Sequence, residues 1–222
     1  MSSFESKTSV IAAVTAVAAF TLYTCTRKKQ ETLEWTLPPW LYKYELSLKD
    51  KTFITDEEMM AVAIKISEIN VKENSGGPFG CAIFERDLET KKSKLFSVGA
   101  NRVVPCNNST LHGEMVAIQT AEKKLKSFSL KNAKEGYEYI MCTSCEPCAM
   151  CLGGTFWALP AEMLCAATKS DAEAIGFDEG PVFPESYKAL EAAGCKVKKE
   201  ILQAEGAKVL NDYAKVGAIY QG

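Results

Sequence analysis

Two short groups of residues with metal-binding side chains constrain this chain more than any other feature of its sequence. The first group is His112-Gly113-Glu114, and the second is Pro147-Cys148-Ala149-Met150-Cys151. Each group stands at the predicted start of a helix that follows a loop. The free amides and the positive dipole end of a helix N-terminus stabilise a thiolate, and so prepare a cysteine for metal binding.

The spacing of these residues predicts one zinc site. Cys148 and Cys151 are three residues apart, so both lie on one face of a helix and can reach the same ion. His112 would supply a third ligand and leave the fourth tetrahedral position for water, as in a catalytic site. Glu114 can reach that water and move its proton. We therefore expect Zn²⁺, one ion per subunit, in a hydrolytic enzyme.

An iron–sulfur protein is the competing interpretation of the cysteines. Cys142, Cys145, Cys148 and Cys151 follow one another at intervals of three. The ferredoxin run has a longer last spacing that ends in proline, whereas Leu152 follows here. That interpretation also leaves His112 and Glu114 without a role. We interpret Cys142, in a strand, and Cys145, in a turn, as structural thiols, because buried free cysteine is common.

Composition excludes several classes of protein. The 222 residues are 47% hydrophobic and 24% charged, which rules out a disordered chain, a collagen-like fibre and a multi-span membrane protein. The net charge of −2 and the pI near 5.7 lack the basic footprint of a protein that covers nucleic-acid phosphates, so we expect no nucleic-acid partner. Nine cysteines cannot all pair internally, which favours a reducing compartment.

The amino-terminal segment is separate from the folded part. Residues 8–26 carry no charge and precede three basic residues, Arg27, Lys28 and Lys29. This stretch is about long enough to span a bilayer, where roughly 20 residues are needed, but it is only mildly hydrophobic. A membrane anchor with a cytosolic domain and a targeting leader both remain open. We divide the chain into a leader (1–30), a Pro/aromatic arm (31–50) and a zinc-dependent domain (51–222).

Helical and strand patterns alternate within residues 51–222. A capping box at Thr55 opens the first helix, and Gly76-Gly77-Pro78 ends it. The expected strands are Phe79–Phe84, Leu95–Val98, Tyr137–Cys142, Met163–Ala167 and Lys196–Ile201. The later helices are expected at Leu111–Leu125, Pro147–Trp157, Pro184–Ala193 and Ala204–Tyr213. This order, with the charged segment 86–94 as a hairpin connection, predicts an α/β sandwich around a mixed sheet.

With these motifs in view, the chain resembles the cytidine-deaminase-like superfamily, whose zinc deaminases share the His-x-Glu and Pro-Cys-x-x-Cys signature. Within it, the similarity is greatest to the bacterial-type guanine deaminases. The segments that carry this resemblance are Gly76–Gly80, Asn101, His112–Glu114, Thr143–Cys151, Trp157 and Gly176–Asp178. The resemblance implies a three-layer α/β/α sandwich with a central mixed five-stranded sheet, a homodimer, and a small-molecule nucleobase as substrate.

The resemblance also implies roles for individual residues. It places zinc on His112, Cys148 and Cys151 and assigns the proton shuttle to Glu114. It gives substrate contacts to Asn101, to the backbone of Gly113, and to Phe79 and Trp157 as parts of an aromatic pocket. The competing interpretation of the two aromatic residues is core packing.

Two departures from the pattern bear on the substrate. Guanine deaminases use a second acid, an Asp, near the end of the Gly-Phe-Asp segment, and here Glu179 follows Asp178 in that place. Glycine stands at position 113, where these enzymes commonly have alanine, and residues 110–114 are more similar to a fungal-type cytosine deaminase.

The sequence thus predicts a zinc-dependent aminohydrolase that converts guanine to xanthine and ammonia. Cytosine deamination is the first alternative, a tRNA wobble-adenosine deaminase the second, and a non-catalytic binding subunit the third. Glu114 argues against the last of these, because a scaffold has no need of a proton shuttle.

Overall fold

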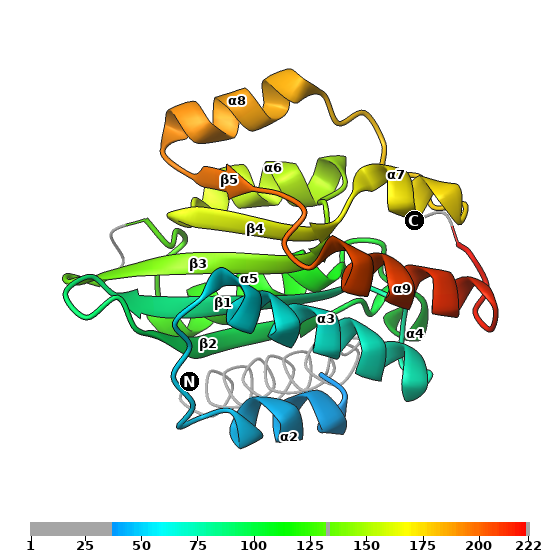
Figure 1. The fold of residues 1–222 in the computed structure, drawn as a ribbon, viewed down its shortest axis with the longest axis horizontal. Helices are drawn as coiled ribbons and strands as arrows, with labels where there is room; N and C mark the ends of the chain where they lie inside the picture. The colour runs from blue at the N-terminus through cyan, green and yellow to red at the C-terminus, as the bar shows by residue number, and fades with distance from the viewer. Residues whose placement is uncertain (1–36, 132–133, 221–222) are drawn as a thin grey trace, which may run out of the picture. The chain divides into compact units, whose positions relative to one another are not determined.

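The computed structural model describes residues 37–131 and 134–220. Its centre is a five-stranded sheet in the order β2-β1-β3-β4-β5 (Figure 1). The strands are β1 (Gly80–Asp87), β2 (Ser93–Ala100), β3 (Tyr137–Cys145), β4 (Glu162–Ala167) and β5 (Lys196–Lys198). Strand β1 is antiparallel to β2 and β3, whereas β3, β4 and β5 are parallel. The prediction of a mixed five-stranded sheet is confirmed.

Helices cover both faces of the sheet (Figure 1). They are α2 (Pro39–Ser47), α3 (Asp56–Lys72), α4 (Val103–Cys106), α5 (Gly113–Leu125), α6 (Ala149–Ala158), α7 (Lys169–Ala174), α8 (Pro184–Ala193) and α9 (Gln203–Ala214). Because side chains alternate along a strand, Ala82 and Phe84 of β1 pack in the core beneath α3, while Cys81 and Ile83 pack beneath α5 and α6. The three-layer α/β/α sandwich is therefore confirmed.

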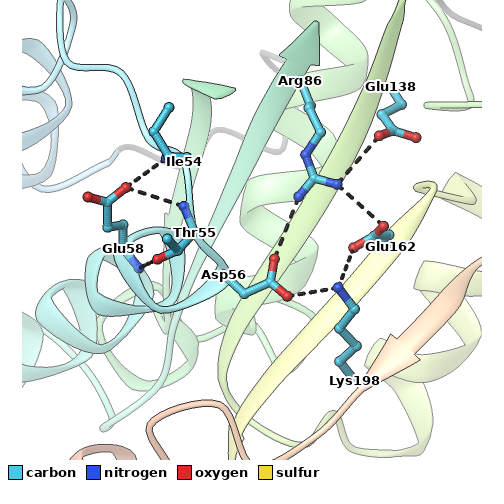
Figure 2. Close-up of polar contacts among 8 residues, drawn as sticks. All are labelled: Ile54, Thr55, Asp56, Glu58, Arg86, Glu138, Glu162 and Lys198. Carbon is cyan, nitrogen blue, oxygen red and sulfur yellow. Dashed lines mark hydrogen bonds and ion pairs between the residues drawn. The ribbon is translucent and has the colours of Figure 1, made fainter. Parts of the chain in front are cut away.

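The start of α3 is fixed by the capping box that the sequence predicts. The Thr55 hydroxyl accepts a hydrogen bond from the backbone N–H of Glu58, and the Glu58 carboxylate accepts from the N–H groups of Ile54 and Thr55 (Figure 2). These two backbone hydrogen bonds, that from Ile54 above all, lower the pKa of Glu58. The box satisfies amides that the first helical turn leaves free.

A cluster of ion pairs joins α3 to four strands at the end of the sheet where β3 and β4 begin (Figure 2). The Arg86 guanidinium lies 3.6 Å from Asp56, 3.5 Å from Glu138 and 3.3 Å from Glu162. Lys198 of β5 adds contacts of 2.8 Å to Asp56 and 3.2 Å to Glu162. The Arg86 side chain is only 13% exposed, so these carboxylates neutralise a mostly buried charge.

This cluster explains one incorrect prediction. The charged segment 86–94 was expected to connect two strands, but β1 continues through Asp87 and β2 begins at Ser93. Arg86 extends the strand because its charge is paired across the sheet, and pairing of this kind leaves no trace in local hydrophobicity. The last strand is shorter than the predicted 196–201, since β5 ends at Lys198.

Among the helices of residues 37–131 and 134–220, three were not predicted: α2, α4 and α7. Helix α2 lies in the segment interpreted as an arm, where Pro39 occupies the first turn and Leu41 is fully buried. The leader, residues 1–30, lies outside the described residues, and so does the uncharged stretch 8–26. Among the helices that the structure describes, none has the length and hydropathy needed to cross a bilayer.

Candidate active site

The two predicted ligand groups lie at the N-termini of neighbouring helices. His112 is the N-cap residue of α5 and Cys148 is the N-cap residue of α6. The two helices are in close contact, because a Cβ atom added at Gly154 of α6 would lie 2.6 Å from the sulfur of Met115 of α5. A side chain at position 154 would have to displace the end of the Met115 side chain.

The three predicted metal ligands form one compact group. The nearest ligand atoms of His112, Cys148 and Cys151 all lie within 4.8 Å of one another, and Nδ1 of His112 is 3.5 Å from Sγ of Cys148. A nitrogen and a sulfur at the usual zinc distances of about 2.0 and 2.3 Å stand roughly 3.5 Å apart in a tetrahedral site. The donor set and its spacing therefore fit zinc with one position left free of protein ligands.

The remaining cysteines of the described chain do not join this group. Cys142 is buried in the core beneath α3, and Cys145 lies in a cluster with Phe177 and Tyr213. Both belong to β3, so the expectation that Cys145 lies in a turn was wrong. Burial raises the pKa of both thiols well above the ordinary value. Neither thiol belongs to the ligand group, which removes the basis of the iron–sulfur interpretation.

The electrostatics of the ligand group favour a thiolate. A hydrogen bond from Cys151 and contact with His112 lower the pKa of Cys148 to about 4. The same hydrogen bond, together with burial, raises the pKa of Cys151. Burial alone would lower the pKa of His112, but the neighbouring Cys148 and Glu114 raise it overall. One preformed thiolate is thus available for a cation.

Glu114 lies beside this group and is held by a neighbour on the sheet. It belongs to the first turn of α5 and is 6% exposed. Its Oε1 atom accepts a hydrogen bond of 3.0 Å from the hydroxyl of Thr143, which lies in β3 and is 2% exposed. Burial, followed by the charge of Cys148, raises the pKa of the carboxyl group. A carboxyl group with a raised pKa beside a metal group is suited to exchange protons.

A small cavity of about 30 Å³ lies over these residues. A wider hollow of about 530 Å³, in the range of small-molecule sites, adjoins it and shares His112, Cys148, Asp178 and Glu179 with it. The lining of the small cavity combines two of the metal ligands, three carboxylates besides Glu114, and aromatic rings: Phe79, Asn101, His112, Glu114, Glu146, Cys148, Phe177, Asp178, Glu179 and Tyr220. The structure thus brings most of the predicted site residues to one place.

Asn101 lines this cavity, and the two halves of its side-chain amide have different surroundings. The residue is 1% exposed, and its Oδ1 atom accepts from the backbone N–H groups of Gly77 (3.4 Å) and Val103 (3.3 Å). The acceptor of the side chain is therefore occupied by the protein, and the Nδ2 donor lies on the cavity side, next to the hydroxyl of Tyr220. The site therefore favours a ligand that has a hydrogen-bond acceptor opposite Nδ2 of Asn101.

The other predicted substrate contacts, Phe79, Gly113 and Trp157, differ in where they lie relative to the cavity. Phe79 lines the cavity and packs edge-to-face against Phe177, with ring centroids 4.9 Å apart. Gly113 packs against the backbone of residues 79 and 80, so that an added Cβ would lie 3.2 Å from the carbonyl oxygen of Phe79. Trp157 does not reach the cavity within this chain: it is 77% exposed at the end of α6 and contacts Phe156.

Glu179 lines the cavity next to the metal group, at the place where the resemblance implies a second acid. It is 6% exposed, and its backbone carbonyl accepts from the N–H of Ala149 in the first turn of α6. Burial, then the charges of Cys148 and Glu114, raise its pKa to about 8. The adjacent Asp178 instead caps its own loop, because its Oδ1 accepts from the N–H of Gly180.

The sequence motifs assign no role to four of the residues that line the cavity: Glu146, Phe177, Asp178 and Tyr220. Glu146 precedes the ligand motif and accepts hydrogen bonds of 2.9 Å from the hydroxyl of Tyr187 and the ammonium of Lys199. The hydroxyl of Tyr220 is buried without a regular hydrogen bond to the described residues, and its ring packs on Phe177. No local pattern shows that a tyrosine near the end of the chain returns to the site.

This fold, with its ligand group and an adjacent buried carboxyl group, is that of a zinc-dependent hydrolytic nucleobase deaminase. The sequence profile described as the cytidine and deoxycytidylate deaminase zinc-binding region matches residues 54–167, and the chain belongs to that family.

Relatives of known function and structure agree with this assignment. Guanine deaminase of Bacillus subtilis (strain 168) is 35% identical over 135 residues, which are 61% of this chain and 79% of the relative. The structure of guanine deaminase from Nitrosomonas europaea is 31% identical, has a TM-score of 0.74, and the match covers 85% of this chain and 99% of that one. A structure in complex with 2,6-diaminopurine is 33% identical, with a TM-score of 0.74 and coverage of 85% and 96%.

Proposed function

We propose that this protein hydrolyses guanine to xanthine and ammonia. The observation that carries the proposal is that one cavity brings Glu114 and the metal ligands His112 and Cys148 together with the Asn101 amide and three aromatic rings. Guanine offers a flat ring for the aromatic side chains and acceptor atoms, O6 and N7, for a donor such as Nδ2 of Asn101. The names of the relatives agree with this substrate.

The metal ligands and Glu114 divide the chemistry between them. His112, Cys148 and Cys151 would hold the zinc ion, which when bound lowers the pKa of water and so supplies a nucleophile at neutral pH. Glu114 accepts one proton from the attacking water and delivers it to the ring nitrogen beside C2. It then takes the second proton, from the hydroxyl formed on C2, and passes it to the leaving amino group. Oxygen from water bonds to C2, the bond from C2 to the exocyclic amino nitrogen breaks, and ammonia leaves with xanthine as the product.

Asn101, Phe79 and Glu179 would orient the base. Asn101 donates to an acceptor on the ring, and Phe79 packs against its face with the backbone of Gly113 nearby. Glu179 is a second carboxyl group on the cavity wall, placed to assist proton transfer to the leaving group.

The decisive experiment measures ammonia release by the zinc-loaded protein. The panel holds guanine, guanosine, cytosine, cytidine, adenine and a tRNA anticodon stem. We expect turnover of guanine. Turnover of cytosine or of the tRNA stem, with none of guanine, would overturn the proposal in favour of that substrate. A protein that binds zinc and releases ammonia from no compound on the panel would instead favour a binding role.

The proposal includes a homodimer and a role for Trp157 in it. Phe156, Trp157 and Phe183 are exposed by 36%, 77% and 58%, although large aromatic side chains are usually covered. Because Trp157 lies away from the cavity of its own chain, a contact with substrate would require a second subunit. Analytical ultracentrifugation of the wild type and of a Trp157→Ser variant tests this. A monomeric wild type would exclude the dimer.

The proposal places the deaminase domain in a reducing compartment, the cytosol, with membrane contact confined to residues 8–26. The eight cysteines of the described residues are all free, which agrees with a reducing environment. Fractionation of cells that express the full chain or a chain beginning at residue 31 tests the membrane contact. Equal distribution of the two chains between membrane and soluble fractions would exclude an anchor.

A further inference from the structure

A series of hydrogen bonds runs from α2 to the backbone of Asn101. The indole N–H of Trp40 donates to Oγ of Ser75 (2.9 Å), and this hydroxyl donates to Oδ1 of Asn70 (2.8 Å). Nδ2 of Asn70 then donates to two carbonyl oxygens, that of Gly77 (2.8 Å) and that of Asn101 (3.0 Å). Both hydrogens of the Asn70 amide therefore have an acceptor.

The orientation of the Asn70 amide follows from these partners. If the amide were rotated by half a turn, its oxygen would face the two carbonyl oxygens and its NH₂ group would lose both acceptors. Asn70 is fully buried on a face of α3 that otherwise packs in the core. A buried amide is costly unless it is fully hydrogen-bonded. An asparagine at this buried position is therefore explained by its hydrogen bonds to the loop that contains Gly77 and to Asn101, and not by apolar packing.

The loop held by Asn70 is the one that fixes the substrate-facing side chain of Asn101. Gly77 is bound on both sides, because its carbonyl accepts from Asn70 and its N–H donates to Oδ1 of Asn101. The packing leaves no spare room: a Cβ atom at Gly76 would overlap the carbonyl oxygen of Asn101. A shift of this loop would therefore move the Asn101 amide.

We propose that Asn70 is a positioning residue that sets the Asn101 amide toward the substrate, and that Trp40 of α2 stabilises it through Ser75. This inference rests on the proposed function, since it takes Asn101 as the group that binds the base. It means that α2, a segment without any residue in the cavity, contributes to the affinity for substrate.

The test compares variants of the full chain. Asn70→Ala is expected to raise KM for guanine about tenfold and to change kcat by less than about threefold, because a misplaced binding group weakens substrate and transition state alike. Trp40→Phe keeps the aromatic packing and removes one donor, so KM should rise about two- to threefold. Zinc content should equal that of the wild type in both variants.

Ser97→Ala is the matched control. Ser97 is also fully buried, and its hydroxyl makes one hydrogen bond of 3.0 Å to a backbone carbonyl, that of Ala117. It has no partner in the Asn70 series. This variant should lower the melting temperature without raising KM. If Asn70→Ala, like the control, has the KM of the wild type, the proposal is wrong.

Hydrogen exchange gives a readout that needs no turnover. The amides of Gly77 and Val103, which donate to Asn101, should exchange faster in Asn70→Ala than in Ser97→Ala, and unchanged exchange would overturn the proposal. If Asn70→Ala does not fold, Asn70→Asp, which keeps the acceptor for Ser75 and removes both donors, takes its place.

The failure of the proposed function can be told apart from the failure of this inference. A wild type that neither releases ammonia from guanine nor binds 2,6-diaminopurine in calorimetry would refute guanine as the substrate. Hydrogen exchange would still decide whether Asn70 holds the loop of Asn101.

Discussion

The hydroxyl of Thr143 donates a hydrogen bond of 3.0 Å to Oε1 of Glu114 and so joins the end of β3 to the first turn of α5. Both side chains are buried. This bond holds Oε1 of the carboxylate, and the same carboxyl group lies in hydrogen-bond contact with the thiol of Cys151. It also restricts the rotation of the group that we expect to carry the proton.

Loss of this bond is expected to lower kcat. Thr143→Val keeps the shape of the side chain and removes the donor, and we expect kcat to fall about tenfold, the effect of one hydrogen bond of about 1.4 kcal/mol. Thr143→Ser keeps the donor and should retain most of the activity. Steady-state kinetics of the two variants, with zinc measured by atomic absorption, checks this. Equal kcat in Thr143→Val and Thr143→Ser would show that the hydroxyl group does not contribute to catalysis.

Removal of the Glu114 carboxylate is expected to stop turnover while zinc remains bound. Glu114→Ala should lower kcat by a factor of about 10² to 10⁴, the usual contribution of general acid–base catalysis. The metal content should stay at one zinc per chain, since Glu114 is not in the ligand group. Loss of zinc from this variant would contradict the role that we assign to the residue.

Removal of the metal is expected to abolish activity reversibly. Incubation with 1,10-phenanthroline should release the zinc, and addition of zinc should restore ammonia production. Cys151→Ser should bind zinc poorly, because a hydroxyl is a weak substitute for a thiolate ligand. Cys142→Ser is the control: its thiol is equally buried but lies outside the ligand group, so its zinc content should match that of the wild type.

Loss of the second carboxyl group is expected to slow purine deamination. Glu179→Gln keeps the size of the side chain and removes its ability to exchange a proton, so kcat should fall by a factor of about 10 to 100. Asp178→Asn, in the neighbouring residue, should have a smaller effect, because Asp178 caps its own loop. Unchanged turnover in Glu179→Gln would remove this residue from the proton-transfer scheme.

Disruption of the ion-pair cluster is expected to lower stability without altering the site. Arg86→Met leaves Glu138 without a cation and Asp56 and Glu162 with Lys198 alone, and we expect the free energy of unfolding to fall by about 2–4 kcal/mol. Lys65→Met, which breaks an exposed pair with Glu68, should cost less than about 1 kcal/mol. Urea denaturation checks both values, and KM for guanine should be unchanged, since the cluster lies at the opposite end of β1 from the cavity.

The accuracy of the sequence predictions varied with the range of the interactions involved. The capping box at Thr55, the two ligand groups and the alternation of helices and strands are local patterns, and the structure has them where they were predicted. The continuation of β1 through Arg86 was missed because the carboxylates that pair with it come from α3, β3 and β4. Helix α2 was missed for the same reason, since its stability depends on the burial of Leu41 and on contacts distant in sequence.

What the sequence by itself determined is the chemistry of the site: ligand spacing of three residues, a histidine and a glutamate two residues apart, and helix starts that favour a thiolate. What only the tertiary structure decided is how this chemistry meets a substrate. The return of Tyr220 to the cavity, the placement of Trp157 away from it, and the fixing of Asn101 by Asn70 depend on contacts between distant segments. Local propensity carries no information about such contacts, because they form only when the layers of the fold pack together.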